Sequence, residues 1–281
     1  MSEPVVWVDG RLLDAGEAAI HPLDHGLTVG DGVFETCGVV GGVPFALTRH
    51  LARLERSAAG LGLPAPDADR VREGVAAVLG RAGGAGRVRV TVTAGVGPLG
   101  SDRHPGGMTY VVAAGSAAGP APAAVIGVPW VRNERSAVAG LKTTSYAENV
   151  VALARAKASG ADEALLANTL GDLCEGTASN VFVEVGDELL TPPLSSGCLA
   201  GITRELVLEW SGVEGLPVRE ARPGELVYEE VLSGVAPLAL SGSVRTVVPV
   251  TAVDGEPRAA GPLVARVCAL YAERATDDLD P

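Results

Sequence analysis

The sequence predicts a mixed α/β (α+β) protein with two domains, and three observations support this fold class. The chain has 281 residues, which is long for a single hydrophobic core. Segments that alternate apolar and polar residues, as strands do, are interspersed with segments whose apolar residues follow a helical period. Residues 116–124 consist only of Ser, Ala, Gly and Pro and are typical of a linker. We therefore expect a small N-terminal domain over residues 1–115, a linker over 116–124 and a large C-terminal domain over 125–281.

The first domain is predicted to contain two hairpins, two helices and two further strands. Asp9-Gly10 and Gly41-Gly42 each separate two apolar runs, which is a strong hairpin signal. Thr48 is a suitable N-cap for a helix that Gly62 would end. The predicted elements are the hairpins around residues 5–13 and 33–47, helices at 48–61 and 69–79, and strands at 87–93 and 110–114. Residues 20–32 and 95–107 are rich in Gly and Pro and are predicted as loops.

The second domain is predicted to alternate strands and helices. We expect strands at residues 125–131, 163–167, 180–185 and 245–250, helices at 147–158, 203–210 and 263–274, and a mixed segment at 227–240. Residues 277–281 are acidic and end the chain, so we expect a frayed tail.

Composition and charge favour a protein that acts on a small molecule in the cytoplasm. The formal charge is −12 and the basic residues form no cluster, which argues against nucleic acid or an anionic membrane as a partner. Four widely spaced cysteines indicate reduced thiols, and we expect neither a secretion signal nor a membrane span, because the first residues lack a basic and apolar pattern and no apolar run is long enough. His21 and His25 are spaced like helical metal ligands, but Pro22 and Gly26 disfavour a helix there, so no metal site is expected.

Lys142 is the first candidate for a catalytic residue. The chain has two lysines, Lys142 and Lys157, and the other 20 of its 22 Lys and Arg residues are arginines. A guanidinium stays protonated in proteins, whereas an ε-amine can lose its proton when buried and condense with an aldehyde. In a chain that uses arginine for nearly all its basic residues, we expect lysine at positions where the chemistry requires an amine. Lys157, at the end of a predicted helix, fits a solvated surface lysine better.

Six segments, in the same order along the chain, resemble the class IV aminotransferases, which are pyridoxal-phosphate enzymes of fold type IV. They are Gly30-Asp-Gly-Val-Phe-Glu-Thr36, His50-Leu-Ala-Arg-Leu54, Lys142-Thr-Thr-Ser-Tyr-Ala-Glu-Asn149, Glu175-Gly-Thr-Ala-Ser-Asn-Val-Phe182, Gly201-Ile-Thr-Arg204 and Ser241-Gly-Ser243. The resemblance covers nearly the whole chain. It implies a smaller N-terminal and a larger C-terminal domain with pyridoxal 5'-phosphate bound between them, and a homodimer.

The resemblance also implies roles for individual residues. Lys142 forms the Schiff base with the cofactor and then moves the proton at Cα, which requires a neutral amine, whereas an unperturbed lysine has a pKa of about 10.4. Tyr146 meets the cofactor's 3'-oxygen, and Glu175 faces the pyridine nitrogen and keeps it protonated. The remaining cofactor-binding residues, several of them for the phosphate, are Arg53, Leu199, Gly201, Ile202, Thr203, Gly242 and Ser243. Phe34, Arg103 and His104 are the candidate substrate-binding residues.

The reaction is predicted to be transamination between D-amino acids and 2-oxo acids, with R-primary amines as further donors. D-amino-acid transaminases often carry an Arg-x-His pair in the loop after the strand at residues 87–93, whereas Arg103 and His104 are adjacent here. The alternative is an aminodeoxychorismate lyase that forms 4-aminobenzoate and pyruvate. A branched-chain L-amino-acid transaminase and a pyridoxal-phosphate binder without turnover are further alternatives.

Overall fold

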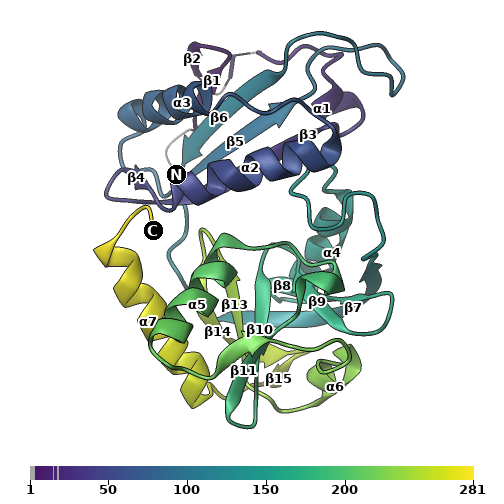
Figure 1. Ribbon diagram of the computed structural model, residues 1–281, viewed down its shortest axis with the longest axis vertical. Coiled ribbons are helices and arrows are strands. Elements are labelled where there is room, and N and C mark those ends of the chain that lie inside the picture. Colours follow the sequence, from purple (N-terminus) through teal and green to yellow (C-terminus); the bar gives the residue numbers. More distant parts are fainter. Residues whose placement is uncertain (1–3, 15, 18) are drawn as a thin grey trace. The chain divides into compact units, whose positions relative to one another are not determined.

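The computed structural model describes residues 4–14, 16–17 and 19–281 (Figure 1). The chain forms two compact units. Unit 1 consists of residues 1–118, 141–146 and 279–281, and unit 2 consists of residues 119–140 and 147–278. The boundary between Ala118 and Gly119 lies inside the predicted linker. In the described ranges, no helix is both long enough and apolar enough to cross a membrane.

Unit 1 is built on a six-stranded antiparallel sheet with the strand order β2-β1-β6-β5-β3-β4. Its strands are β1 (Val5–Val8), β2 (Arg11–Asp14), β3 (Gly32–Val40), β4 (Val43–Pro44), β5 (Arg87–Thr93) and β6 (Thr109–Gly115). Its helices are α1 (His25–Thr28), α2 (Leu47–Leu61) and α3 (Ala68–Arg81). Both hairpins and the strand at residues 87–93 are confirmed, although the returning strand of the second hairpin ends at Pro44 and not at residue 47.

Helices α2 and α3 cover one face of this sheet (Figure 1). The covered face carries alternate residues of the central strands, among them Val33 and Val90, which pack against Leu54 of α2 and Val75 of α3. Because side chains alternate along a strand, Phe34 of β3 and Thr91 of β5, which are register partners, share the opposite face. Arg89, two residues from Thr91, lies on that face too. The sheet therefore separates a packed core from a face that carries polar and aromatic side chains.

The segment that contains Lys142 belongs to unit 1, although the sequence placed it in the second domain. Phe34 N–H donates to the carbonyl of Lys142 at 3.0 Å, and Thr144 N–H donates to the carbonyl of Gly32 at 2.8 Å. Residues 142–144 thus pair with the start of β3 in the manner of an extra strand. Local periodicity cannot reveal such a pairing, because its partners are more than 100 residues apart in the chain.

The end of the chain is ordered by unit 1, so the prediction of a frayed tail is wrong. Asp280 accepts hydrogen bonds from Thr48 N at 2.8 Å and from Thr48 Oγ1 at 2.6 Å, and the Pro281 carbonyl accepts one from Arg49 Nε. Thr48 is not the N-cap of α2. The helix begins one residue earlier, and Ala46 occupies the cap position with φ 54° and no side-chain bond. The Asp280 carboxylate, although distant in the chain, accepts the hydrogen bond from the first turn of α2 that an N-cap side chain would otherwise accept.

Unit 2 contains a nine-stranded mixed sheet with the order β12-β11-β10-β13-β14-β7-β8-β9, and β15 pairs with β14. Its strands are β7 (Ala123–Arg132), β8 (Glu163–Asn168), β9 (Leu173–Gly176), β10 (Asn180–Val185), β11 (Glu188–Thr191), β12 (Val218–Glu220), β13 (Leu238–Gly242), β14 (Thr246–Val253) and β15 (Glu256–Pro257). Its helices are α4 (Ala147–Ala158), α5 (Ile202–Val213), α6 (Tyr228–Ser233) and α7 (Pro262–Asp277), with a 3₁₀ turn η1 (Leu194–Ser196). The helix at 147–158 and the strand at 180–185 have the predicted bounds.

The apolar core of unit 2 includes two clusters among the described residues. The larger joins the buried sides of the sheet strands to Tyr228 and Val231 of α6. The smaller places Ala152 and Ala156 of α4 against β7 and β8. Strand β7 begins at Ala123, inside the predicted linker, because residues 123–125 pair with β14.

The loop predicted at residues 20–32 contains the one-turn helix α1. Asp24 caps it by accepting from Gly26 N at 2.8 Å. His25 is buried and its Nε2 lies 3.0 Å from the Pro98 carbonyl, while His21 Nδ1 accepts from Leu23 N. These contacts account for both histidines as local hydrogen-bonding groups.

Candidate catalytic and cofactor-binding site

Lys142 is held by the backbone of β3 and by helix α2. Its carbonyl accepts from Phe34 N, as described above, and its own N–H donates to Ser57 Oγ of α2 at 3.2 Å. Thr144 and Ser145 both donate from their hydroxyls to the Gly30 carbonyl, at 2.8 and 3.0 Å. These bonds fix the direction in which the lysine side chain leaves the backbone.

The side chains of Lys142, Tyr146 and Arg89 gather around the ring of Phe34. Lys142 Nζ lies 4.5 Å from the Phe34 ring centroid and the Arg89 guanidinium carbon lies 3.8 Å from it. Tyr146 meets the same ring edge to face, with the centroids 5.2 Å apart. Cations over an aromatic face are attracted by the ring quadrupole. Unit 1 therefore presents a primary amine, a phenol and a guanidinium around one aromatic ring.

Arg89 is the residue of this group that our sequence reasoning missed. Desolvation lowers the pKa of its guanidinium from the ordinary value, and the neighbouring Tyr146 acts in the opposite direction. Its Nε donates a long hydrogen bond, of 3.4 Å, to Thr91 Oγ1. The alternation of Arg87-Val-Arg-Val placed Arg89 on one face of a strand, but only the pairing of Thr36 with Arg89 brings it beside Phe34.

Arg53 lies in a buried cluster with Glu35 and His50 on the helix-covered side of β3. Its Nε and Nη2 donate to the two carboxylate oxygens of Glu35 at 2.7 and 2.6 Å, and His50 Nδ1 lies 2.6 Å from Glu35 Oε2. Burial tends to raise the pKa of Glu35, but Arg53 and His50 outweigh it and bring the pKa to about 2. Desolvation lowers the pKa of His50, and the Glu35 carboxylate acts in the opposite direction. A role of Arg53 toward a phosphate stays a prediction.

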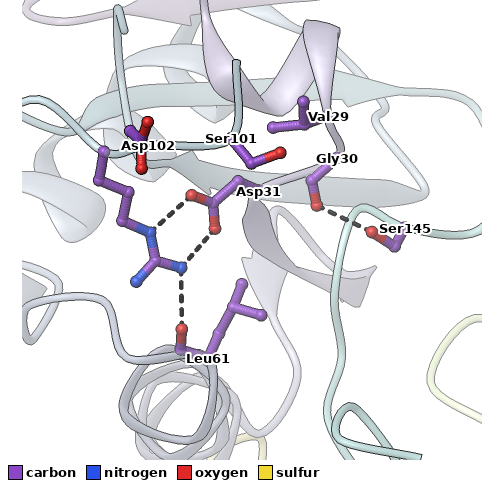
Figure 2. Close-up of a pocket in the computed structure, with 8 residues that line it drawn as sticks. Val29, Gly30, Asp31, Leu61, Ser101, Asp102 and Ser145 are labelled. Carbon is purple, nitrogen blue, oxygen red and sulfur yellow. Dashed lines mark hydrogen bonds and ion pairs between the residues drawn. The ribbon is translucent and has the colours of Figure 1, made fainter. Parts of the chain in front are cut away.

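Arg103 is engaged by an acidic side chain and by the end of α2. Its Nε and Nη2 donate to Asp31 at 2.7 and 2.6 Å, and its two Nη atoms also donate to the carbonyls of Leu61 and Gly62. Asp31, Leu61 and Ser145 lie around a pocket of about 520 Å³ that Arg103 also lines (Figure 2). His104 is exposed in the same loop. Arg103 thus bridges the loop at 95–107 to the start of β3, and its contact with a substrate stays a prediction.

Unit 2 holds Glu175 between a guanidinium and a backbone amide. Arg132 Nε donates to Glu175 Oε1 at 3.1 Å, and Leu199 N donates to Oε2 at 3.0 Å. Glu175 is 9% exposed. Both contacts favour the ionised form of Glu175. A carboxylate that keeps a pyridine nitrogen protonated must itself be ionised.

The predicted phosphate-binding residues of unit 2 surround the start of α5. Gly201 is the N-cap and makes no side-chain cap bond, so the first helix turn, with Ile202 and Thr203, offers backbone N–H groups to an anion. A Cβ on Gly201 would collide with Asn180 Oδ1, so a larger residue there would have to displace the Asn180 side chain, which donates from Nδ2 to the Leu199 carbonyl.

Ser241 pairs with Asn180 across β13 and β10, next to Gly242 and Ser243. Its buried Oγ has no hydrogen-bond partner among the described residues. An uncapped helix start beside an orphaned hydroxyl fits a phosphate ester, and the carboxylate of Glu175 fits a protonated ring nitrogen.

Comparisons with known proteins identify the family of the chain. Residues 32–253 match the family model described as Amino-transferase class IV. The chain is 31% identical to a putative branched-chain-amino-acid aminotransferase of Methanocaldococcus jannaschii, over 89% of this chain and 88% of that protein. It is 30% identical to a bifunctional aminodeoxychorismate lyase / D-amino acid transaminase of Mycobacterium tuberculosis, over 86% and 90%.

A solved structure shows the same fold with a cofactor. It is described as the PLP-bound form of a hypothetical aminotransferase from Mycobacterium tuberculosis, with a TM-score of 0.82 and 26% identity over 98% of this chain and 100% of that chain. The relatives include branched-chain, D-amino-acid and lyase enzymes, so the finer substrate class is a separate question. With the family match, this similarity identifies the chain as a member of the class IV aminotransferases, enzymes of fold type IV that use pyridoxal 5'-phosphate.

Proposed function

We propose that the protein transfers amino groups between D-amino acids and 2-oxo acids, with R-primary amines as further donors. The observation that carries this proposal is the group around Phe34, where the amine of Lys142 and the guanidinium of Arg89 lie over the same ring. A reacting amine beside a cation suits a substrate that carries a carboxylate on the carbon to be deprotonated. We further propose that the protein acts as a homodimer in the cytoplasm.

Pyridoxal phosphate supplies an electron sink for the electrons released at Cα when its ring nitrogen is protonated. Lys142 would hold the cofactor through its amine and would move a proton at the substrate's Cα. The Arg89 guanidinium lies over the same ring as the Lys142 amine. Tyr146 would donate toward the cofactor's 3'-oxygen, and Glu175 would hold the proton of the ring nitrogen.

The phosphate is assigned to the start of α5 and the hydroxyl groups beside it. Backbone N–H groups at Gly201–Thr203 stabilise an anion through the helix dipole, and Leu199, Gly242 and Ser243 complete the surroundings. Arg53 is a further candidate, because its guanidinium is rigidly oriented by Glu35. Arginine recognises phosphate through directed N–H bonds, and orientation matters as much as charge.

For the substrate carboxylate we propose Arg89, with Phe34 as its supporting surface. Arg103 and His104 remain candidates from the resemblance, but the Asp31 carboxylate and the carbonyls of Leu61 and Gly62 together engage all three nitrogens of the Arg103 guanidinium. D-amino acids are proposed first because the segments at residues 30–36 and 142–149 resemble the D-amino-acid and lyase branches. The similarity to a bifunctional lyase and D-amino acid transaminase supports the same choice and keeps the lyase as the second candidate.

A donor screen tests this proposal. Pyruvate and D-glutamate formed from D-alanine and 2-oxoglutarate are the expected products. Activity confined to branched-chain L-amino acids would contradict the D-amino-acid assignment, and formation of 4-aminobenzoate and pyruvate from aminodeoxychorismate would establish the lyase instead. No turnover of any of these would leave a cofactor binder.

Lys142→Ala should lose the cofactor's covalent absorbance and several orders of magnitude in rate. Lys157→Ala is the matched control, because Lys157 is exposed and pairs only with Asp162 at 3.2 Å in the described contacts. Wild-type rates in Lys142→Ala would overturn the mechanism.

A further inference from the structure

We propose that Arg132 is a positioning residue that keeps the proton on the cofactor's ring nitrogen by holding Glu175 ionised and correctly oriented. This inference rests on the proposed role of Glu175. Arg132 is the last residue of β7, and its side chain is 17% exposed. Its Nε donates to Glu175 Oε1 at 3.1 Å, and its Nη2 donates to Asn149 Oδ1 at 3.1 Å.

The guanidinium is anchored at the start of α4, which gives the contact with Glu175 a fixed direction. Asn149 is buried and donates from Nδ2 to the Thr177 carbonyl at 2.7 Å, in the turn that follows Glu175. Glu148 adds a longer ion pair with Arg132 at 3.3 Å, from an exposed side chain. Arg132 therefore connects three elements and presents Nε to one carboxylate oxygen.

The position of the proton decides how well the ring accepts electrons. A proton shared between a pyridine nitrogen and a carboxylate can rest on either group, and only the protonated ring is a strong electron sink. The Arg132 guanidinium contacts the Glu175 carboxylate directly, so it favours the ionised form of Glu175. A carboxylate held ionised would leave the proton on a ring nitrogen that it faces. Leu199 N acts on the other oxygen in the same sense.

Removing the guanidinium should shift the proton toward Glu175 and slow the steps at Cα. A hydrogen bond to a charged group contributes enough to change an equilibrium by roughly 10- to 100-fold. We expect Arg132→Gln to lower kcat by about that factor, with a smaller change in the affinity for the cofactor, because the phosphate contacts are elsewhere.

A purely structural role for Arg132 predicts a different result. If Arg132 only joins β7 to α4, its loss lowers thermal stability and every activity without moving the ring proton. The readout must therefore report the ring nitrogen itself. Nitrogen NMR of the holoenzyme, loaded with pyridoxal phosphate that is isotopically labelled at the ring nitrogen, distinguishes the protonated from the neutral ring.

Four proteins are compared: the wild type, Arg132→Gln, Glu175→Gln and Arg135→Gln. Arg135 is the matched control, because it is three residues away, its side chain is 82% exposed, and its ion pair is with Glu134 at 3.8 Å. We expect the nitrogen signal of Arg132→Gln to move toward that of the neutral ring, in the direction of Glu175→Gln, while Arg135→Gln matches the wild type. If Arg132→Gln does not fold, Arg132→Lys replaces it in the comparison. Lysine keeps the positive charge but lacks the planar guanidinium, so the nitrogen signal should move in the same direction by a smaller amount.

The deaza analogue of the cofactor, in which carbon replaces the ring nitrogen, gives an independent readout. With it the wild type and Arg132→Gln should have equal rates, because there is no ring proton to hold. If Arg132→Gln gives the wild-type nitrogen signal while Glu175→Gln gives a displaced one, the proposed role of Arg132 is refuted and that of Glu175 stands. An unmoved signal in Glu175→Gln shows that Glu175 does not face the ring, and then the proposed role of Glu175 fails together with this inference.

Discussion

Arg89→Met tests whether the cation beside Lys142 selects substrates that carry a carboxylate. Methionine is close to arginine in length and can still pack against Phe34, so the change removes charge and N–H donors more than volume. Arg89 does not belong to the core of unit 1, since the cluster that packs the helices onto the sheet lies on the other face. We therefore expect little loss of stability and a large loss of discrimination.

The magnitude follows from the carboxylate of the substrate. Loss of a charge-assisted contact with a carboxylate costs about 1.5–3 kcal/mol, or roughly 10- to 150-fold in kcat/KM for amino acids and 2-oxo acids. An R-amine without a carboxylate makes no such contact, so its kcat/KM should change little.

The assay is the ratio of kcat/KM for D-alanine to that for an R-amine without a carboxylate, measured in the wild type, Arg89→Met and Arg87→Met. Arg87 is the matched control, because it lies two residues away on the same strand and makes no described contact with Phe34. The ratio should fall only in Arg89→Met. Equal losses for both substrates would refute the assignment. If Arg103→Ala lowered kcat/KM for D-alanine but not for the R-amine, and Arg89→Met lowered neither, the substrate carboxylate would be bound by Arg103, in the loop predicted from the sequence.

Three further predictions concern the groups that support the site. Glu35 has its pKa lowered from 4.5 to about 2, so its ion pairs stabilise the fold above pH 4.5 and are lost as the pH falls toward 2. Glu35→Gln should therefore have a lower free energy of unfolding at neutral pH, and this free energy should fall less steeply with decreasing pH in denaturant titrations. In the wild type the lowered pKa of Glu35 contributes on the order of 3 kcal/mol to the free energy of unfolding. Asp280→Ala should lower the unfolding free energy by about 0.5–2 kcal/mol, because Thr48 N loses its acceptor, and an unchanged melting temperature would show that the tail contact is not formed in solution. Gly201→Ala should weaken cofactor binding in a fluorescence titration, since its Cβ would displace Asn180 at the start of α5, whereas Gly212→Ala, in open space on the same helix, should bind like the wild type.

The sequence predicted most elements because their signals are local. Alternating residues fixed the strand at 87–93, and Asp9-Gly10 and Gly41-Gly42 fixed both hairpins. The scarcity of lysine singled out Lys142 before any fold was considered. The resemblance then supplied Tyr146 and Glu175 through short motifs with recognisable order. These features depend on neighbours within a few residues, or on composition, so no tertiary information was needed.

The tertiary structure decided which residues support Lys142 and Glu175. Arg89 reaches Phe34 only because β5 pairs with β3 in one register, and a shift by one residue would turn Arg89 to the helix-covered face. Arg132 meets Glu175 because strands β7, β8 and β9 lie side by side, although the two residues are 43 positions apart.

The sequence by itself indicated the family and the cofactor, because short motifs carry both, and it made Lys142 the first candidate for the reacting amine. The structure alone decided that Arg103 binds Asp31, that Asp280 replaces Thr48 as the acceptor at the start of α2, and that Arg89 shares an aromatic ring with Lys142. An ion pair or a cap can be satisfied by any suitable group that the fold brings within about 3 Å. Residue type shows that such a partner is needed, and only the path of the chain shows which residue provides it.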